Sequence, residues 1–256
     1  MPFTVSHAVL APIIHKITGN KLPISALAIG CMVPDLFRLF TDKVTDETHL
    51  WSALIYPNLL IGLGFCCVWY FIIRPSVFRF INISHPIKFE DPQAFILFLI
   101  YVIISIIIGT STHIIWDGLT HLDARTFAFH QVLALNMSVL GHSFPVHLIL
   151  QILSSILTLP ILGWMSLKYY RHHKSNLIRP TAIKLFAYSL FALAILAGIY
   201  GYIHFASPYN FEPWDDLYSY LGKSINYFFR GFLMALTLGC LIFQILEQLN
   251  IFDDQS

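Results

Sequence analysis

The feature that most constrains this chain is a series of five apolar segments, each long enough to cross a membrane. A spanning helix needs about 20 apolar residues to cross roughly 30 Å of hydrocarbon. The segments that meet this requirement are residues 52–73, 94–116, 144–167, 182–204 and 225–246. The sequence therefore predicts an all-α fold, a polytopic transmembrane helical bundle with five strong spans.

Composition supports this class and excludes others. Of the 256 residues, 57% are hydrophobic and only 11% are charged, whereas about 25% of the residues of a soluble domain are charged. This balance excludes a water-soluble enzyme. The formal net charge of +1 gives no basic excess for binding nucleic acid, so the expected partners are membrane lipids, with substrate and oligomeric state left open.

A sixth apolar stretch, residues 22–40, is weaker because Pro34, Asp35 and Arg38 lie near its end. It either spans the membrane or forms a buried or re-entrant helix. No linker or repeat divides the sequence, so we expect a single integral membrane domain over residues 1–256. Amphipathic and apolar helices would occupy residues 1–50, and the transmembrane helices would occupy residues 51–250.

The distribution of basic residues predicts the orientation of the chain. Lys and Arg gather at residues 74–88 and 168–184, whereas residues 117–143 contain Arg125 alone and residues 205–224 contain Lys223 alone. Short basic loops stay on the cytoplasmic side. The two basic loops and the C-terminal tail are therefore predicted to be cytoplasmic, and the two other loops extracytoplasmic.

The sharpest local motif is THIIWDGLTH at residues 112–121, which places His113, Asp117 and His121 four residues apart. Residues i and i+4 share one face of a helix, and two imidazoles with a carboxylate form part of a typical site for a divalent ion. The alternative is that these are interfacial polar residues, with Asp117 capping a turn. If Gly118 ends the helix early, His121 approaches from a loop instead.

Three further residues are candidates for the same site. His49 is predicted to lie on the same side of the membrane as His113, and Asp35 follows a proline at the end of an apolar stretch. Asp35 has an equally good alternative role in pairing with Arg38. His7 can join Asp35 only if residues 22–40 do not span the membrane, since a full span would put the two on opposite sides.

Other histidines and the cysteines have weaker claims. We expect accessory roles at most for His130, His142 and His147, which follow in the outer loop. The four cysteines lie inside apolar runs without metal-site spacing, which favours small core residues. They are Cys31, Cys66, Cys67 and Cys240.

Five sequence blocks resemble, in the same order, a bacterial membrane family labelled domain of unknown function 4184. They are MPFTVSHAV, SALAIGCMVPD, THLWSALIYPNLLIGL, GTSTHIIWDGLTH and FPVHLILQILSSILTLPIL, within residues 1–170. The pattern is also similar to inner-membrane proteins named membrane-bound metal-dependent hydrolases. The resemblance implies a multi-pass protein of the bacterial inner membrane. Its implied metal ligands or near neighbours are His7, Asp35, His49, His113 and Asp117.

The leading hypothesis is an extracytoplasmic divalent-metal site, with zinc or manganese, that hydrolyses a lipid or phosphoester substrate. A metal ion would lower the pKa of a bound water toward about 7. Asp35 would coordinate the metal or act as general base, and His121 would ligate or protonate the leaving group. The alternatives are a transporter that binds or relays an ion, a structural membrane protein with a metal as a folding staple, and a haem protein, which needs histidines facing each other inside the bundle.

Overall fold

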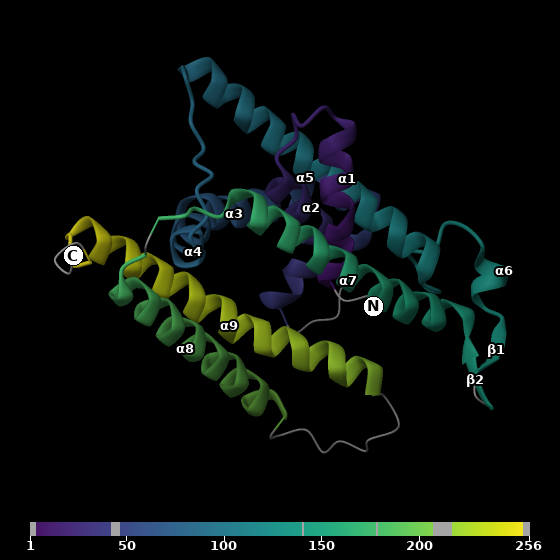
Figure 1. Cartoon of the computed structure of the whole chain (residues 1–256). Helices are drawn as coiled ribbons and strands as arrows, with labels where there is room; N and C mark the ends of the chain where they lie inside the picture. The colour runs from purple at the N-terminus through teal and green to yellow at the C-terminus, as the bar shows by residue number, and fades with distance from the viewer. Residues whose placement is uncertain (1–3, 42–46, 140, 178, 207–216, 253–256) are drawn as a thin grey trace. The chain divides into compact units, whose positions relative to one another are not determined.

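The computed structural model describes residues 4–41, 47–139, 141–177, 179–206 and 217–252. The loop at 207–216, predicted to be extracytoplasmic, and the last residues of the C-terminal tail lie outside this described part. The described residues form two compact units, and Figure 1 labels the helices and strands that belong to them. Unit 1 contains Met1–Cys66 and Ile87–Tyr169, and unit 2 contains Cys67–Pro86 and Tyr170–Ser256. The expectation of a single domain stays a prediction.

The fold is helical, as predicted. The α-helices are α1 (Leu10–Ile17), α2 (Ile24–Leu36), α3 (Leu60–Cys67), α4 (Arg74–Ile81), α5 (Pro92–Thr120), α6 (His130–Leu133), α7 (Val146–His173), α8 (Thr181–Ala206) and α9 (Leu217–Gln248). Shorter 3₁₀ segments are η1 (Thr4–Val9), η2 (Phe37–Leu39), η3 (Glu47–His49) and η4 (Trp51–Ala53), and π-helical turns are η5 (Leu54–Leu59) and η6 (Val68–Ile73).

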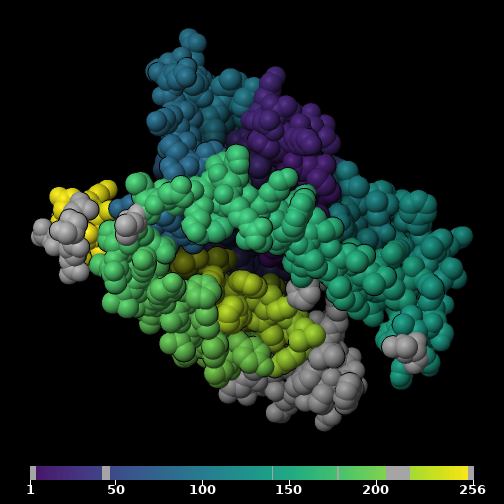
Figure 2. Space-filling view, viewed as in Figure 1, coloured from purple at the N-terminus to yellow at the C-terminus, as the bar shows by residue number. Residues whose placement is uncertain are grey.

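Five helical stretches are long and apolar enough to span a membrane, and each contains or overlaps one predicted segment. They are Trp51–Ile81, Pro92–Thr120, Val146–His173, Thr181–Phe205 and Tyr220–Gln248. Helices α7 and α8, coloured green in Figure 2, carry exposed apolar side chains such as Leu157 and Leu196. Apolar surface of this kind suits contact with lipid. The protein is a multi-pass membrane protein.

Two details differ from the sequence-based expectation. The third span begins at Val146, because Phe144 and Pro145 belong to a small hairpin of strands β1 (Asn136–Val139) and β2 (His142–Pro145). The strands are antiparallel, and Asn136 is opposite Pro145. Of the four cysteines, Cys67 is exposed, so the prediction that all four are core residues was wrong for this one.

The sixth apolar stretch forms a short buried helix. Helix α2 has 13 residues, which at 1.5 Å per residue is about 20 Å, too short to cross roughly 30 Å of hydrocarbon. It packs against α5 through two glycines. A Cβ on Gly30 would lie 2.7 Å from the carbonyl oxygen of Ile106, and one on Gly109 would lie 2.6 Å from the carbonyl oxygen of Leu27. The two backbones therefore touch directly, without side chains between them.

Unit 2 has a different kind of core. Phe80 of α4 contacts Phe243 of α9 with ring centroids 4.6 Å apart, and Phe186, Phe252, Ile183 and Leu190 surround them. Helices α8 and α9 also approach through glycines, because a Cβ on Gly231 would lie 2.3 Å from the carbonyl oxygen of Ala197. Within the described residues, unit 2 buries aromatic and aliphatic side chains, with Ser76 and Ser224 as its buried polar residues.

Candidate metal centre

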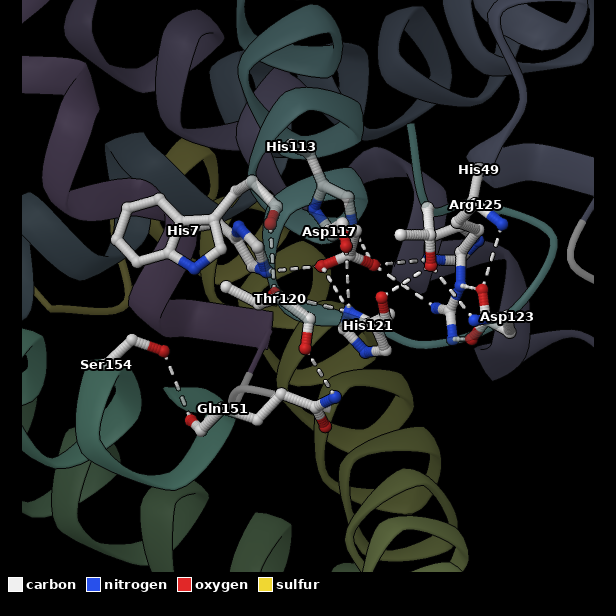
Figure 3. A network of polar contacts seen from close by, with 12 residues as sticks. His7, His49, His113, Asp117, Thr120, His121, Asp123, Arg125, Gln151 and Ser154 are labelled. Carbon is white, nitrogen blue, oxygen red and sulfur yellow. Dashed lines mark hydrogen bonds and ion pairs between the residues drawn. The ribbon is translucent and has the colours of Figure 1, made fainter. Parts of the chain in front are cut away.

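Six ionisable side chains from four segments of unit 1 meet at the end of α5, and Figure 3 labels all of them except Asp35. Segment η1 contributes His7, α2 contributes Asp35, and η3 contributes His49. Helix α5 contributes His113 and Asp117, and His121 follows its last residue. None of the six is more than 6% exposed. Carboxylates are almost never fully buried unless they are paired or bind a metal, and a buried imidazole needs a partner for its polar nitrogens.

The short length of α2 makes this assembly possible. A common site for His7 and Asp35 requires that residues 22–40 do not cross the membrane, and α2 meets that condition. The glycine contact between α2 and α5 then fixes the two helices in register. As a result the Nδ1–H of His113 donates a hydrogen bond of 2.7 Å to the carbonyl oxygen of Cys31.

Asp117 is at the centre of the cluster. Its carboxylate oxygens lie 3.5 Å from Nε2 of His113, 3.5 Å from Nε2 of His49, 3.6 Å from Nε2 of His7 and 3.6 Å from Nδ1 of His121. These separations exceed the usual 2.7–3.2 Å of a hydrogen bond. They are close to the separation of about 3.4 Å expected between two ligand atoms that lie about 2.1 Å from a tetrahedral ion.

Asp35 contacts both the cluster and Arg38. Its Oδ2 accepts a hydrogen bond of 2.9 Å from the hydroxyl of Thr4, and its Oδ1 lies 3.3 Å from Nε2 of His49 and 3.6 Å from Arg38. Burial on its own raises the pKa of Asp35, but the contact with His49 and the neighbouring His113 and Arg38 outweigh it and hold the pKa well below its usual value. Pairing with Arg38 and membership of the cluster are therefore compatible.

The histidines outside the spans are held neutral by burial. Burial lowers the pKa of His7 to about 3 and that of His121 to about 4, and it also lowers the pKa of His49. A neutral imidazole offers a lone pair on one ring nitrogen, which is the form that binds a metal.

Neighbouring groups constrain where two of the histidines carry their protons. A carbonyl oxygen can only accept, so His113 carries its proton on Nδ1 and its Nε2 faces Asp117. The hydroxyl of Thr48 donates to the carbonyl of Pro34 at 2.9 Å, so its oxygen is left to accept from Nδ1 of His49 at 3.3 Å. Nε2 of His49 lies 3.3 Å from Oδ1 of Asp35, a second acceptor, so the single proton of the neutral ring can satisfy only one of the two oxygens.

Acceptors therefore face acceptors in the centre of the cluster. Nε2 of His113 and Oδ1 of Asp117 have no hydrogen-bond partner among the described residues, and neither ring nitrogen of His7 has one. Each unsatisfied buried polar group costs about 1–3 kcal/mol. A positive charge between these atoms, either protons on the imidazoles or a cation, would remove the conflict.

Two groups of three side chains have ligand atoms within 4.8 Å of one another: His7 with Asp35 and His113, and His49 with His113 and Asp117. Their members are the five residues proposed as ligands from the sequence. Metal binding by them stays a prediction. Helix α5 does not end at Gly118 but continues to Thr120. His121 is the next residue, and its side chain lies beside Asp117.

Sequence reasoning missed the residues that support the cluster. Arg125 lies 3.3 Å from Asp117 and also pairs with Asp123. The sequence did contain a signal for Arg125, because it is the only Lys or Arg at residues 117–143, a stretch predicted to be extracytoplasmic. Thr4 and Thr48 carried no signal, because a threonine beside a histidine has no distinctive pattern.

The weaker histidine candidates lie elsewhere. His130 and His142 are exposed, and His142 begins β2. His147 donates from Nδ1 to the carbonyl of Leu133 at 3.2 Å. Among the described residues, none of the three belongs to a group that could hold a metal ion.

The fold and the site together define a multi-pass membrane protein with a buried histidine and aspartate cluster at one end of a span. The chain belongs to the family described as Domain of unknown function (DUF4184), whose family model matches residues 1–244. The predicted family is thus confirmed, and the match extends beyond the blocks within residues 1–170. No curated protein and no solved structure matches the chain.

Proposed function

We propose that unit 1 binds a divalent metal ion through His7, Asp35, His49, His113 and Asp117. The observation that carries this proposal is the buried meeting of imidazole nitrogens and carboxylate oxygens at 3.3–3.6 Å, in which Nε2 of His113 faces Asp117 with its lone pair. A cation between these atoms would attract both the lone pair of His113 and the carboxylate oxygens. Protons on His7, His49 and His121 are the weaker explanation, because burial depresses the pKa of these three imidazoles.

The donor atoms favour zinc or manganese. Imidazole nitrogens suit zinc, and added carboxylates suit manganese. No thiolate contributes within the cluster, since the sulfur of Cys31 contacts the hydroxyl of Thr112 at 3.4 Å and burial raises the pKa of this thiol to about 11. Hydrogen bonds from His113 to Cys31 and from His49 to Thr48 supply the outer partners that orient metal-binding imidazoles.

We further propose that the centre hydrolyses a phosphoester, with a lipid as the substrate class. A bound divalent ion would supply a water of lowered pKa and would stabilise negative charge on the phosphoryl oxygens. Asp35 keeps its carboxylate ionised and is positioned by Thr4, so it can accept a proton from water. The Nδ1–H of His121 faces the carbonyl oxygen of Asp117 at 3.2 Å, and its Nε2 has no partner among the described residues. In the neutral ring Nε2 is therefore an acceptor, so His121 can take up a proton there and pass it to the leaving oxygen.

An apolar groove beside the cluster supports a lipid substrate. It has a volume of about 290 Å³ and is lined by Leu10 of α1 and by Thr112, Ile115, Trp116, Leu119 and Thr120 of α5. Trp116 links the groove to the cluster, because its ring meets the ring of His7 edge-on with centroids 5.4 Å apart. An acyl chain in this groove would bring its headgroup toward the ligands. The resemblance to membrane-bound metal-dependent hydrolases points to the same class of reaction and to a bacterial inner membrane. The distribution of basic residues points to the extracytoplasmic side of the membrane.

A structural metal is the second candidate, and one observation favours it. All five ligands are at least 94% buried, and a closed shell leaves no position for a substrate. A transporter is less favoured. Among the described residues, His113 and Asp117 are the only fully buried charged or imidazole side chains within the five spans, and both lie at one end of α5 rather than along a path through the spans.

The first experiment measures metal content. The detergent-purified chain, its His113→Ala and Asp117→Ala variants and the control His130→Ala are analysed by inductively coupled plasma mass spectrometry. We expect stoichiometric zinc or manganese in the wild type and in His130→Ala, and its loss in the other two. A folded wild type that takes up no metal when zinc and manganese are supplied would refute the proposal.

A second experiment separates catalysis from a structural role. The metal-loaded wild type, His121→Gln and Asp35→Asn are assayed with phosphoester lipids in mixed micelles. Hydrolysis by the wild type, lost in His121→Gln with its metal retained, supports the hydrolase. Full metal occupancy without turnover of any phosphoester lipid supports the structural role.

A further inference from the structure

Unit 2 contains an apolar groove that the proposed function does not use. It has a volume of about 400 Å³ and lies among α4, α8 and α9. Its walls include Phe80, Ala187, Leu190, Phe191, Phe232 and Leu236. Ligand pockets have volumes of about 300–1,000 Å³, so this groove suits a single acyl chain better than a whole diacyl lipid.

Two cations border this groove. Arg179 and Lys184 belong to its lining, and both are half-buried. Nε of Arg179 is buried without a hydrogen-bond partner among the described residues. Arg79 of the same unit differs, because it pairs with Glu247 at 2.9 Å. In the described part of the chain, no carboxylate is found paired with Arg179 or Lys184.

The start of α8 adds to this positive charge. Arg179 lies just before the helix and Lys184 lies in its first turn, where the amide of Lys184 donates to the carbonyl of Pro180 at 3.3 Å. The preceding amides at the N-terminus of a helix have no partner within the helix and attract anions. The candidate membrane span also begins at Thr181, so this positive region lies at the depth of lipid headgroups.

We propose that the groove binds one anionic phospholipid, with an acyl chain against the apolar walls and the phosphate between Arg179, Lys184 and the N-terminus of α8. The two cations match an anionic headgroup, and the apolar walls match an acyl chain. A free phosphate would leave the apolar walls exposed, and a neutral lipid would leave the half-buried cations without a counter-charge. The site is separate from the metal centre and does not depend on it.

The test is native mass spectrometry of the full chain in neutral detergent, titrated with dioleoyl phosphatidylglycerol or dioleoyl phosphatidylcholine. We expect one phosphatidylglycerol to bind roughly 10- to 30-fold more tightly than phosphatidylcholine, the effect of two interfacial cations. The variant Arg179→Gln/Lys184→Gln should lose this preference. The variant Ala187→Leu, which narrows the groove, should weaken the binding of both lipids.

The matched control is Arg171→Gln/Lys174→Gln, which removes the same charge from exposed positions outside the groove. It should keep the preference. An equal loss in the control would show general attraction of lipid to a basic segment and overturn the proposal. Equal binding of the two lipids, full competition by inorganic phosphate, or a lipid-free dimer in place of the lipid complex would also overturn it.

Discussion

The centres of the two units differ in the kind of side chain that they bury, which is polar in unit 1 and aromatic in unit 2. Unit 1 gathers four histidines and two aspartates around the end of α5, and most of their polar atoms face one another. Unit 2 buries a group of aromatic rings around Phe80 and Phe243. Unit 1 thus has a centre that needs a counter-charge, whereas the centre of unit 2 is complete without one.

Both units nevertheless use the same device where two helices meet. Glycines let α2 approach α5 in unit 1 and let α8 approach α9 in unit 2. Small residues that allow backbones to come close are a common means of packing helices in membranes. The close approach serves packing in unit 2, but in unit 1 it also determines the position of His113.

Removal of the metal should produce the largest difference in stability between the two units. If the ion is present at 1,000 times its Kd, it stabilises the state that binds it by about 4 kcal/mol. Chelation should therefore speed amide exchange in η1, α2 and the end of α5 by up to about 1,000-fold and leave α8 and α9 unchanged. Hydrogen exchange with mass spectrometry, with and without chelator, measures this difference. Equal effects in both units would show that the contrast between them is wrong.

The substitution Gly109→Ala should combine loss of stability with loss of metal. A Cβ at this position would lie 2.6 Å from backbone atoms of Cys31 and Leu27, so α2 must move away and the hydrogen bond from His113 to Cys31 must lengthen. Strain of this kind costs about 1–3 kcal/mol. Thermal unfolding and metal content are measured together.

The matched control in unit 1 is Gly64→Ala. A Cβ on Gly64 would have no heavy atom within 4 Å, so the variant should unfold at the wild-type temperature and keep its metal. If Gly109→Ala retained full metal content despite its lower stability, the helix contact would serve packing alone.

The sequence predicted the helices better than it predicted the way in which they pack. The five spans follow from length and hydropathy, because only a helix satisfies backbone groups in hydrocarbon. Whether residues 22–40 span the membrane could not be predicted, since a mostly apolar stretch of 19 residues that ends with Pro34, Asp35 and Arg38 fits either a span or a buried helix. The packing of α2 depends on Gly30 and Gly109, whose partners lie far away in the sequence.

The candidate site shows the same division. The i, i+4 spacing predicted that His113 and Asp117 share a face, and the side of the membrane predicted that His49 could join them. The sequence could not supply the central position of Asp117, which is contacted from three other segments. It also gave no reason to expect that Thr48 and Cys31 orient the rings of His49 and His113, because these contacts require the folded backbone.

In unit 2, Gly231→Ala should weaken packing without affecting metal. A Cβ there would lie 2.3 Å from the carbonyl oxygen of Ala197, so α8 and α9 must separate at a cost of about 1–3 kcal/mol. Unfolding of unit 2, followed by hydrogen exchange in α8 and α9, should occur at lower temperature. Gly222→Ala is the control, because its Cβ would meet nothing within 4 Å. A drop in metal content for Gly231→Ala would show that the units depend on each other.

The smallest effect is expected for Arg125→Gln. Arg125 approaches Asp117 at 3.3 Å and also pairs with Asp123, so its charge competes with a metal ion for the same carboxylate while supplying no ligand atom. Metal stoichiometry should stay at the wild-type level, and affinity measured by competition with a chelator should rise by a few-fold, since a repulsive charge has been removed. Loss of metal comparable to that of His113→Ala would instead make Arg125 a structural support of the centre. The contrast between the units would then rest on a wider set of residues than the five ligands.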